Sequence, residues 1–159
     1  MTVSKHQGVR WESRKIAVVA ARWNSFITDE MMEAAVEALR SKGIKETNIV
    51  QYRCPGSFEL TLACKWCLEH LSVDGVVAIG AVIRGETPHF DYVCDSVTRG
   101  ITDLNLHYGK PVAFGVLTTD TVDQASERAS TDKGNKGAEA AVALCDMLEL
   151  EHSMKQRDM

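Results

Sequence analysis

The chain alternates between short apolar runs and longer stretches in which apolar residues recur every three or four positions. The first run, KIAVVAA at 15–21, is short and rich in β-branched residues, which is typical of a strand buried on both faces. Similar runs predict further strands at 49–54, 74–83 and 111–117. The pattern therefore predicts four strands, separated by segments long enough to hold helices.

Helical periodicity follows each predicted strand. In residues 28–42 apolar side chains recur at intervals of four, Thr28 stands at the N-cap position, and Gly43 stands where a C-terminal cap belongs. The acidic pair at 29–30 suits the positive end of such a helix. The remaining predicted helices lie at 57–71, 90–107, 120–128 and 137–150. Strands that alternate with helices predict an α/β fold: a flavodoxin-like, three-layer αβα sandwich around a four-stranded parallel sheet.

No internal repeat or flexible linker interrupts the 159 residues, so we expect one domain at 15–150, with an N-terminal extension at 1–14 and a C-terminal tail at 151–159. In sheets of this kind ligands bind outside the carboxyl ends of the strands. The loops there, expected at 22–27, 54–59, 82–90 and 117–120, should meet at one edge and carry the functional side chains.

The net charge is −4 and no run of Lys and Arg is present, which argues against a nucleic-acid partner. The first fourteen residues contain no apolar block of signal-peptide length, and no later stretch suits a membrane span, so we expect no membrane association. Five cysteines form an odd set without a framework spacing. They suit free thiols in a reducing compartment, here the cytoplasm.

The segment GAVIRGETPHFDY at 80–92 leaves the most apolar predicted strand and enters a helix. It resembles a nucleotide phosphate loop, but Glu86 stands where that motif needs its lysine, which disfavours nucleotide hydrolysis. Backbone amides at a helix start can still bind a single phosphate. His89 closes the loop and is either a proton-transfer residue or a solvated residue at the helix start.

Two other predicted loops carry residues with open alternatives. Ser57 is fully explained as a helix cap, whereas the carboxylate of Glu59 suits both a first helical turn and a polyol hydroxyl group. Trp23 is either a core residue or an exposed indole that stacks on a planar heterocycle, with the amide of Asn24 beside it.

The pair Cys64 and Cys67 has a redox or metal spacing, but it lies inside an apolar predicted helix and has no second pair, so we interpret it as two buried thiols. Arg128 and Lys136 lie near a helix end and a helix start. Such cations are usually solvated, but they become anchors where the substrate is anionic.

Five segments together resemble the lumazine synthase family of riboflavin biosynthesis: ARWNSFIT, PGSFEL, AIGAVIRGETPHFDYVCDSVTRG, PVAFGVLTTDT and GNKGAEAA. They follow the family's order from about residue 15 to 150. The resemblance implies that a ribityl-pyrimidine, 5-amino-6-(D-ribitylamino)uracil, condenses with a four-carbon ketone phosphate, 3,4-dihydroxy-2-butanone 4-phosphate. The product is 6,7-dimethyl-8-ribityllumazine, and no metal and no other cofactor is required.

The resemblance also implies residue roles. The pyrimidine and its ribityl chain would contact Trp23, Asn24, Ser57, Phe58, Glu59, Ala81, Val82 and Ile83. The phosphate would be bound by the loop of Gly85, Glu86 and Thr87 with Arg128 as its cation, and His89 would transfer protons. Phe114, Lys136 and Arg128 would reach the site across a subunit boundary, because the family forms pentamers. The spacing from Arg128 to Lys136 lacks the extra residues of family members that stop at a pentamer, so the resemblance implies twelve pentamers in an icosahedral shell rather than a free pentamer.

Three positions depart from the family pattern. Trp23 is often Phe, Cys54 replaces the usual valine, and Ser130 replaces an expected glycine. The first keeps an aromatic ring for stacking and the other two touch no proposed catalytic group. A non-catalytic module that binds flavin or lumazine remains the main alternative, whereas a flavodoxin-like electron carrier is disfavoured because no Ser/Thr-rich phosphate loop follows the first strand.

Overall fold

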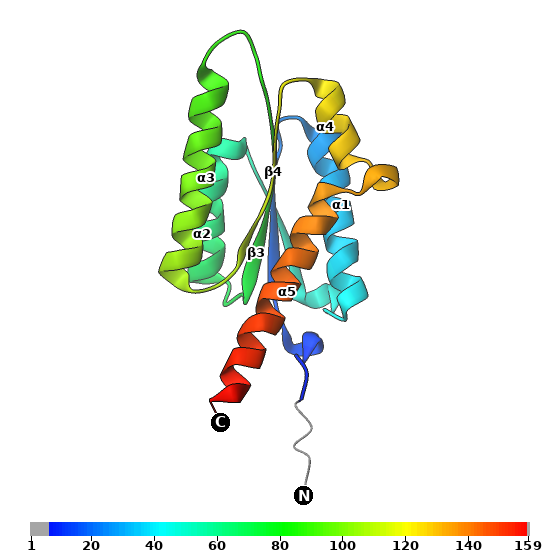
Figure 1. Cartoon of the computed structure of the whole chain (residues 1–159), viewed down its shortest axis with the longest axis vertical. Helices are drawn as coiled ribbons and strands as arrows, with labels where there is room; N and C mark the ends of the chain where they lie inside the picture. The colour runs from blue at the N-terminus through cyan, green and yellow to red at the C-terminus, as the bar shows by residue number, and fades with distance from the viewer. Residues whose placement is uncertain (1–6, 159) are drawn as a thin grey trace, which may run out of the picture.

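The computed structural model describes residues 7–158 and shows a four-stranded parallel sheet (Figure 1). Its strands are β1 (Ile16–Ala21), β2 (Ile49–Cys54), β3 (Gly75–Ile83) and β4 (Val112–Thr119), in the spatial order β2-β1-β3-β4. Every adjacent pair is parallel. The four predicted strands are confirmed, and β4 continues two residues past its predicted end.

Helices cover both faces of the sheet, so the three-layer, flavodoxin-like arrangement is confirmed (Figure 1). One face packs against α1 (Ser25–Lys42), α4 (Val122–Ala129) and α5 (Lys136–Arg157). The other face packs against α2 (Leu60–His70) and α3 (His89–Tyr108). Short 3-10 turns lie at Trp11–Ser13, Glu46–Asn48, Ser57–Glu59 and Thr131–Lys133.

Strand β1 lies at the centre of the sheet and all six of its residues are buried. Ile16, Val18 and Ala20 pack on the α1 and α5 side, and the residues between them pack on the α2 and α3 side. A polar side chain on either face would lose its hydration without a partner, which is why this strand is a continuous apolar run.

The strands end at two different levels, and this difference shapes the upper edge of the sheet. Pairing between β1 and β3 is recorded only as far as Ala20 and Ile79, whereas β3 remains paired with β4 as far as Ile83 and Thr119. From residue 80 to residue 83, the edge of β3 that faces β1 therefore has no strand partner among the described residues. Backbone groups there are open to a ligand or to loop side chains.

The start of α1 differs from the prediction. The helix begins at Ser25, so Thr28 is not its N-cap and the acidic pair at 29–30 is not in its first turn. Thr28 is fully buried, and its hydroxyl donates to the backbone oxygen of Ala21 at 2.7 Å. Asn24 holds the cap position with φ of 61°. The C-terminal cap at Gly43 is confirmed, with φ of 111°.

The terminal segments lie together at the lower end of the molecule (Figure 1). Helix α5 continues beyond 150, the predicted end, as far as Arg157. His152 and Gln156 on its last turns contact the backbone oxygen of Gln7, and Trp11 packs against the α1 and α5 side of the core. Residues 1–6 of the predicted N-terminal extension and residue 159 of the predicted tail lie outside the described residues. None of the described helices combines the length and apolar character needed to cross a bilayer.

Candidate active site

A hollow of about 460 Å³ lies at the carboxyl ends of β1, β2 and β3. Except for Val93, every residue that lines it is a candidate from the sequence: Trp23, Asn24, Ser57, Phe58, Glu59, Ala81, Val82, Ile83 and His89. The predicted loops after these three strands therefore do meet at one edge. We call this hollow the stacking pocket.

Trp23 forms one wall of the stacking pocket and is 66% exposed, so it is not a core residue. Its backbone N–H donates to the oxygen of Pro55 at 3.0 Å. Backbone hydrogen bonding between the two chain segments therefore continues beyond the ends of β1 and β2. The indole of Trp23 lies against Gly56, where an added Cβ would come within 2.4 Å of the ring. The indole thus lies against a glycine, and most of Trp23 is exposed to solvent.

Asn24 connects the first loop to β3. Its side-chain amide donates to the backbone oxygen of Ala81 at 2.9 Å, on the part of β3 that has lost its pairing with β1. Asparagine tolerates the left-handed backbone conformation observed here better than most residues. Asn24 therefore fixes the distance between Trp23 and the open edge of β3.

Ser57 and Glu59 come from the turn between β2 and α2. The Ser57 hydroxyl is buried and has no hydrogen-bond partner among the described residues, and it lies close to Gly80 of β3. Ser57 is the first residue of the 3-10 turn rather than its cap, so the capping interpretation is wrong for this residue. Glu59 accepts the N–H of Gly56 at 3.0 Å through one carboxylate oxygen, which confirms its first-turn role and leaves the other oxygen at the pocket wall.

The loop between β3 and α3 carries the candidate phosphate-binding residues Gly85, Glu86 and Thr87, all exposed. It leads directly into the N-terminus of α3, which begins at His89. The backbone N–H of His89 donates to the Thr87 hydroxyl at 3.4 Å, and the histidine side chain lines the stacking pocket. An anion bound by this loop would therefore lie next to the imidazole.

The remaining candidates lie elsewhere, in a second hollow of about 410 Å³ along β4. Its lining includes Phe114, Arg128 and Lys136, and no residue lines both this hollow and the stacking pocket. The Arg128 guanidinium donates to the backbone oxygen of Gln124 at 3.0 Å, and the Lys136 ammonium pairs with Glu139 at 2.8 Å. We call this hollow the β4 pocket.

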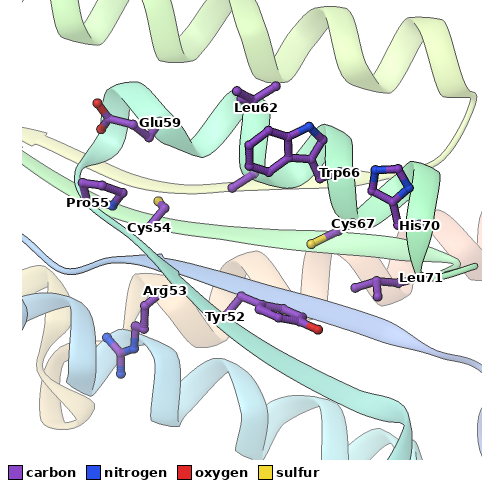
Figure 2. Close-up of a pocket in the computed structure, with 11 residues that line it drawn as sticks. Tyr52, Arg53, Cys54, Pro55, Glu59, Leu62, Trp66, Cys67, His70 and Leu71 are labelled. Carbon is purple, nitrogen blue, oxygen red and sulfur yellow. The ribbon is translucent and has the colours of Figure 1, made fainter.

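A third hollow, of about 540 Å³, lies between β2 and α2 and is mainly apolar (Figure 2). Figure 2 shows Tyr52, Leu62 and Trp66 around it, and each of these side chains is about half exposed. This groove was not predicted from the sequence. The signal was present in α2, because Leu62 and Trp66 are four residues apart on a helix whose buried side is formed by other apolar residues.

The cysteines behave as small apolar residues. All five are free, and Cys64 and Cys67 are buried in α2 as predicted. Burial raises the pKa of both thiols, and it raises the pKa of Cys54 to about 11. Redox and metal sites need thiolates, which burial disfavours here. Within residues 7–158 no cluster of His, Cys, Asp and Glu is arranged to hold a metal ion.

Known proteins of one family are similar to this chain over most of its length. The family model of 6,7-dimethyl-8-ribityllumazine synthase matches residues 13–152. The chain is 51% identical over 133 residues to the 6,7-dimethyl-8-ribityllumazine synthase of Parabacteroides distasonis. The matched region covers 84% of this chain and 83% of that relative. Proteins of the same name from Porphyromonas gingivalis and Cytophaga hutchinsonii are 50% and 48% identical, over 86% of this chain and 85% and 86% of their own lengths. The chain therefore belongs to the 6,7-dimethyl-8-ribityllumazine synthase family.

Proposed function

We propose that this chain catalyses the penultimate step of riboflavin biosynthesis, and that each active site combines the stacking pocket of one subunit with the β4 pocket of another. The observation that carries the proposal is the division of the candidate residues between two hollows with no common lining residue. Neither hollow alone offers a stacking surface, a proton-transfer group and a cation for phosphate. Together they offer all three.

In this proposal the stacking pocket binds the ribityl-pyrimidine. Trp23 stacks on the heterocycle, and the open backbone edge of β3 at Val82 and Ile83 pairs with the polar edge of the ring. The ribityl hydroxyl groups meet Ser57 and Glu59. The Ser57 hydroxyl has no hydrogen-bond partner within the described part of the chain, and this supports the placement, because a buried polar group without a partner costs free energy that a ligand hydroxyl can offset.

The ketone phosphate binds at the next loop. Amides of Gly85, Glu86 and Thr87 face its phosphate at the start of α3, and Arg128 of a second subunit supplies the positive charge. Phe114 and Lys136 of that second subunit close the pocket over the heterocycle. Both substrates are then held at one place, and such positioning lowers the barrier by about 7–11 kcal/mol at best.

The reaction needs proton transfers rather than a cofactor in this proposal. The pyrimidine amine attacks the ketone carbonyl and water leaves, which gives an imine. Elimination of phosphate and ring closure with loss of a second water complete the lumazine. His89 is next to the phosphate loop and its imidazole moves protons at these steps, since a histidine can both donate and accept near neutral pH.

We propose that copies of the chain assemble as pentamers, and that twelve pentamers form an icosahedral shell. The apolar groove between β2 and α2 supports self-association, because half-exposed aromatic side chains such as Tyr52 and Trp66 gain from being covered by another copy (Figure 2). We place the enzyme in the cytoplasm, where its five free thiols stay reduced.

Mixing two inactive variants tests the shared site. Trp23→Ala damages only the stacking pocket and Arg128→Ala damages only the β4 pocket. If the site is shared, dissociating and reassembling the two variants together restores part of the activity, because some interfaces then contain two intact halves. No recovery in reassembled particles would place each site within one chain.

Two further measurements complete the test. Light scattering separates a shell from a free pentamer, because their masses differ twelvefold, and a fully active monomer would contradict the shared site. Fluorescence of the product, with the two substrates supplied together, separates an enzyme from a module that only binds flavin or lumazine. Such a module would quench its tryptophan fluorescence on ligand addition but form no product.

A further inference from the structure

Arg84, the residue that follows β3, joins three parts of the upper edge. Its Nε donates to a carboxylate oxygen of Asp120 at 2.8 Å, and its Nη1 lies 3.5 Å from a carboxylate oxygen of Asp91. Its guanidinium carbon lies 4.3 Å from the ring centroid of Phe90. Asp120 follows β4, whereas Phe90 and Asp91 are in the first turn of α3. One side chain therefore links the β4 end to both ends of the loop between β3 and α3.

The loop itself has few other supports. Residues 85–89 are exposed, and a Cβ at Gly85 would meet no atom of residues 7–158 within 4 Å. Within the described chain, its recorded hydrogen bonds are the weak one between His89 and Thr87, at 3.4 Å, and a backbone bond from Asp91 to Pro88. A short exposed segment with so few contacts samples many conformations unless its ends are held.

Arg84 holds both ends of the loop between β3 and α3, one through its own backbone and the other through its side chain. Its backbone N–H donates to the oxygen of Thr119 at 2.9 Å, so the residue is anchored to β4 by main chain as well as by side chain. Asp120 is fixed in turn, because its N–H donates to the side-chain oxygen of Gln124 at 2.8 Å. The carboxylate that accepts from Arg84 is thus carried by a backbone segment that is itself hydrogen-bonded.

The guanidinium of Arg84 is paired with the carboxylates of Asp91 and Asp120. Its hydrogen bond to Asp120 and the negative charge of Asp91 raise the pKa of Arg84. Removing the arginine would leave these two carboxylates facing the loop that receives a phosphate, without a cation between them. Arg84 therefore differs from Arg128, whose recorded contact is a backbone oxygen and whose charge is not paired with a carboxylate in the described residues.

We infer that Arg84 is a positioning residue for the ketone phosphate: by bridging Asp91 and Asp120 it holds the amides of Glu86 and Thr87 and the imidazole of His89 in one arrangement. The inference rests on the proposed function of this loop. The pyrimidine half of the site depends on it much less, because Trp23, Asn24 and the β3 edge are held by contacts that do not involve Arg84.

Steady-state kinetics with both substrates tests this role. In Arg84→Gln we expect kcat/KM for the ketone phosphate to fall about 10- to 100-fold, because displacements of about 1 Å at a reacting group have effects of that size. The KM for the pyrimidine should stay within about twofold. Inorganic phosphate, used as a competitive inhibitor, should bind more weakly by a similar factor as the ketone phosphate.

Three companion variants sharpen the test. Arg84→Lys keeps the positive charge but cannot bridge two carboxylates with a planar fork, so it should recover activity only in part. Asp120→Asn removes the bridge from its other end, and the double variant with Arg84→Gln should be little worse than either single variant. Arg40→Gln is the matched control, because Arg40 is also exposed and pairs with two carboxylates at the far end of α1.

Three results would overturn the inference. Unchanged kinetics in Arg84→Gln would show that the loop holds its arrangement without the bridge. Full activity in Arg84→Lys would show that charge alone suffices. A fall in pyrimidine affinity and melting temperature together with the phosphate effect would show a general role in folding. Arg128→Ala is measured in parallel: if it binds inorganic phosphate as well as the unmodified chain does, the proposed role of Arg128 fails whatever Arg84 shows.

Discussion

Gly56→Ala should move the indole of Trp23 and little else. The backbone at Gly56 is extended, with φ of −142° and ψ of −177°, so alanine fits without strain. Its Cβ would lie 2.4 Å from Cε3 and 2.6 Å from Cζ3 of the indole. Ordinary contact begins near 3.4 Å, so the ring has to retreat by about 1 Å (3.4 − 2.4).

The retreat should cost binding rather than stability. Trp23 is 66% exposed, so its ring can swing into solvent without disturbing the core. Replacing glycine at a compatible position stabilises a protein by about 0.4–1 kcal/mol through the unfolded state, which offsets part of the lost packing. A misplaced aromatic stack loses about 0.5–1.5 kcal/mol, which corresponds to about a two- to tenfold weaker Kd for the pyrimidine.

Fluorescence titration with an unreactive pyrimidine analogue measures this Kd, and thermal melting measures stability. Gly8→Ala is the control, because a Cβ at Gly8 would meet no atom of the described residues within 4 Å. In a Trp23→Phe background the same Gly56→Ala change should matter less, since phenylalanine lacks the outer indole carbons nearest to the added methyl. Wild-type affinity in Gly56→Ala, or an equal loss in both backgrounds, would refute the stacking geometry.

Three other predictions concern stability and reactivity. Gly137→Ala should lower the melting temperature, with a loss of about 1–3 kcal/mol, because its Cβ would come within 2.2 Å of the backbone oxygen of Met31 where α5 crosses α1; an unchanged melt would contradict this packing. Iodoacetamide at pH 8 should modify the half-buried Cys94 before Cys64, whose thiolate is disfavoured by burial, and mass spectrometry of digested protein shows the order. Hydrogen bonds from Lys65 and Tyr108 lower the pKa of Glu69 in the folded protein. The carboxylate therefore stabilises the fold above about pH 4.5, and this stabilisation is lost as the pH falls through the lowered pKa of the folded state. In urea unfolding measured from pH 6 to pH 3, Glu69→Gln should lose less stability on acidification than the unmodified chain.

The sheet was predictable because its central strands have no polar face. In β1 every residue is buried on one face of the sheet or the other, and a short uninterrupted apolar run is typical of a parallel strand covered on both faces. The loops that form the stacking pocket followed from the same reasoning, since parallel strands bring their carboxyl ends to one edge. Gly43 was predictable too, because a helix end of this kind requires the left-handed conformation that glycine adopts freely.

Two features that the local sequence pattern does not indicate depend on tertiary contacts. Thr28 has the composition of a cap, but its hydroxyl donates to Ala21 on the preceding strand, so the helix begins earlier. Arg84 lies in the segment at 80–92 that was compared with a nucleotide phosphate loop, and no role was predicted for it. Its partner Asp120 lies 36 residues away, and nothing in the local pattern indicates that the two meet. Local propensity is a weak guide wherever such tertiary contacts decide.

The topology of the sheet explains why one copy cannot complete the proposed site. Strand β4 is one edge of the sheet, with Arg128 and Lys136 beside it, whereas the stacking pocket opens over β1, β2 and the near edge of β3. If the β4 pocket of one subunit closes the stacking pocket of a second, the first subunit's own stacking pocket remains open, because the two surfaces are different parts of the chain. Either the second copy returns the contact, as in a two-fold dimer, or a third copy closes the open pocket, and so on around the assembly. The pentamer proposed above uses the second, head-to-tail arrangement, and a head-to-tail contact that leaves no site incomplete has to close into a ring.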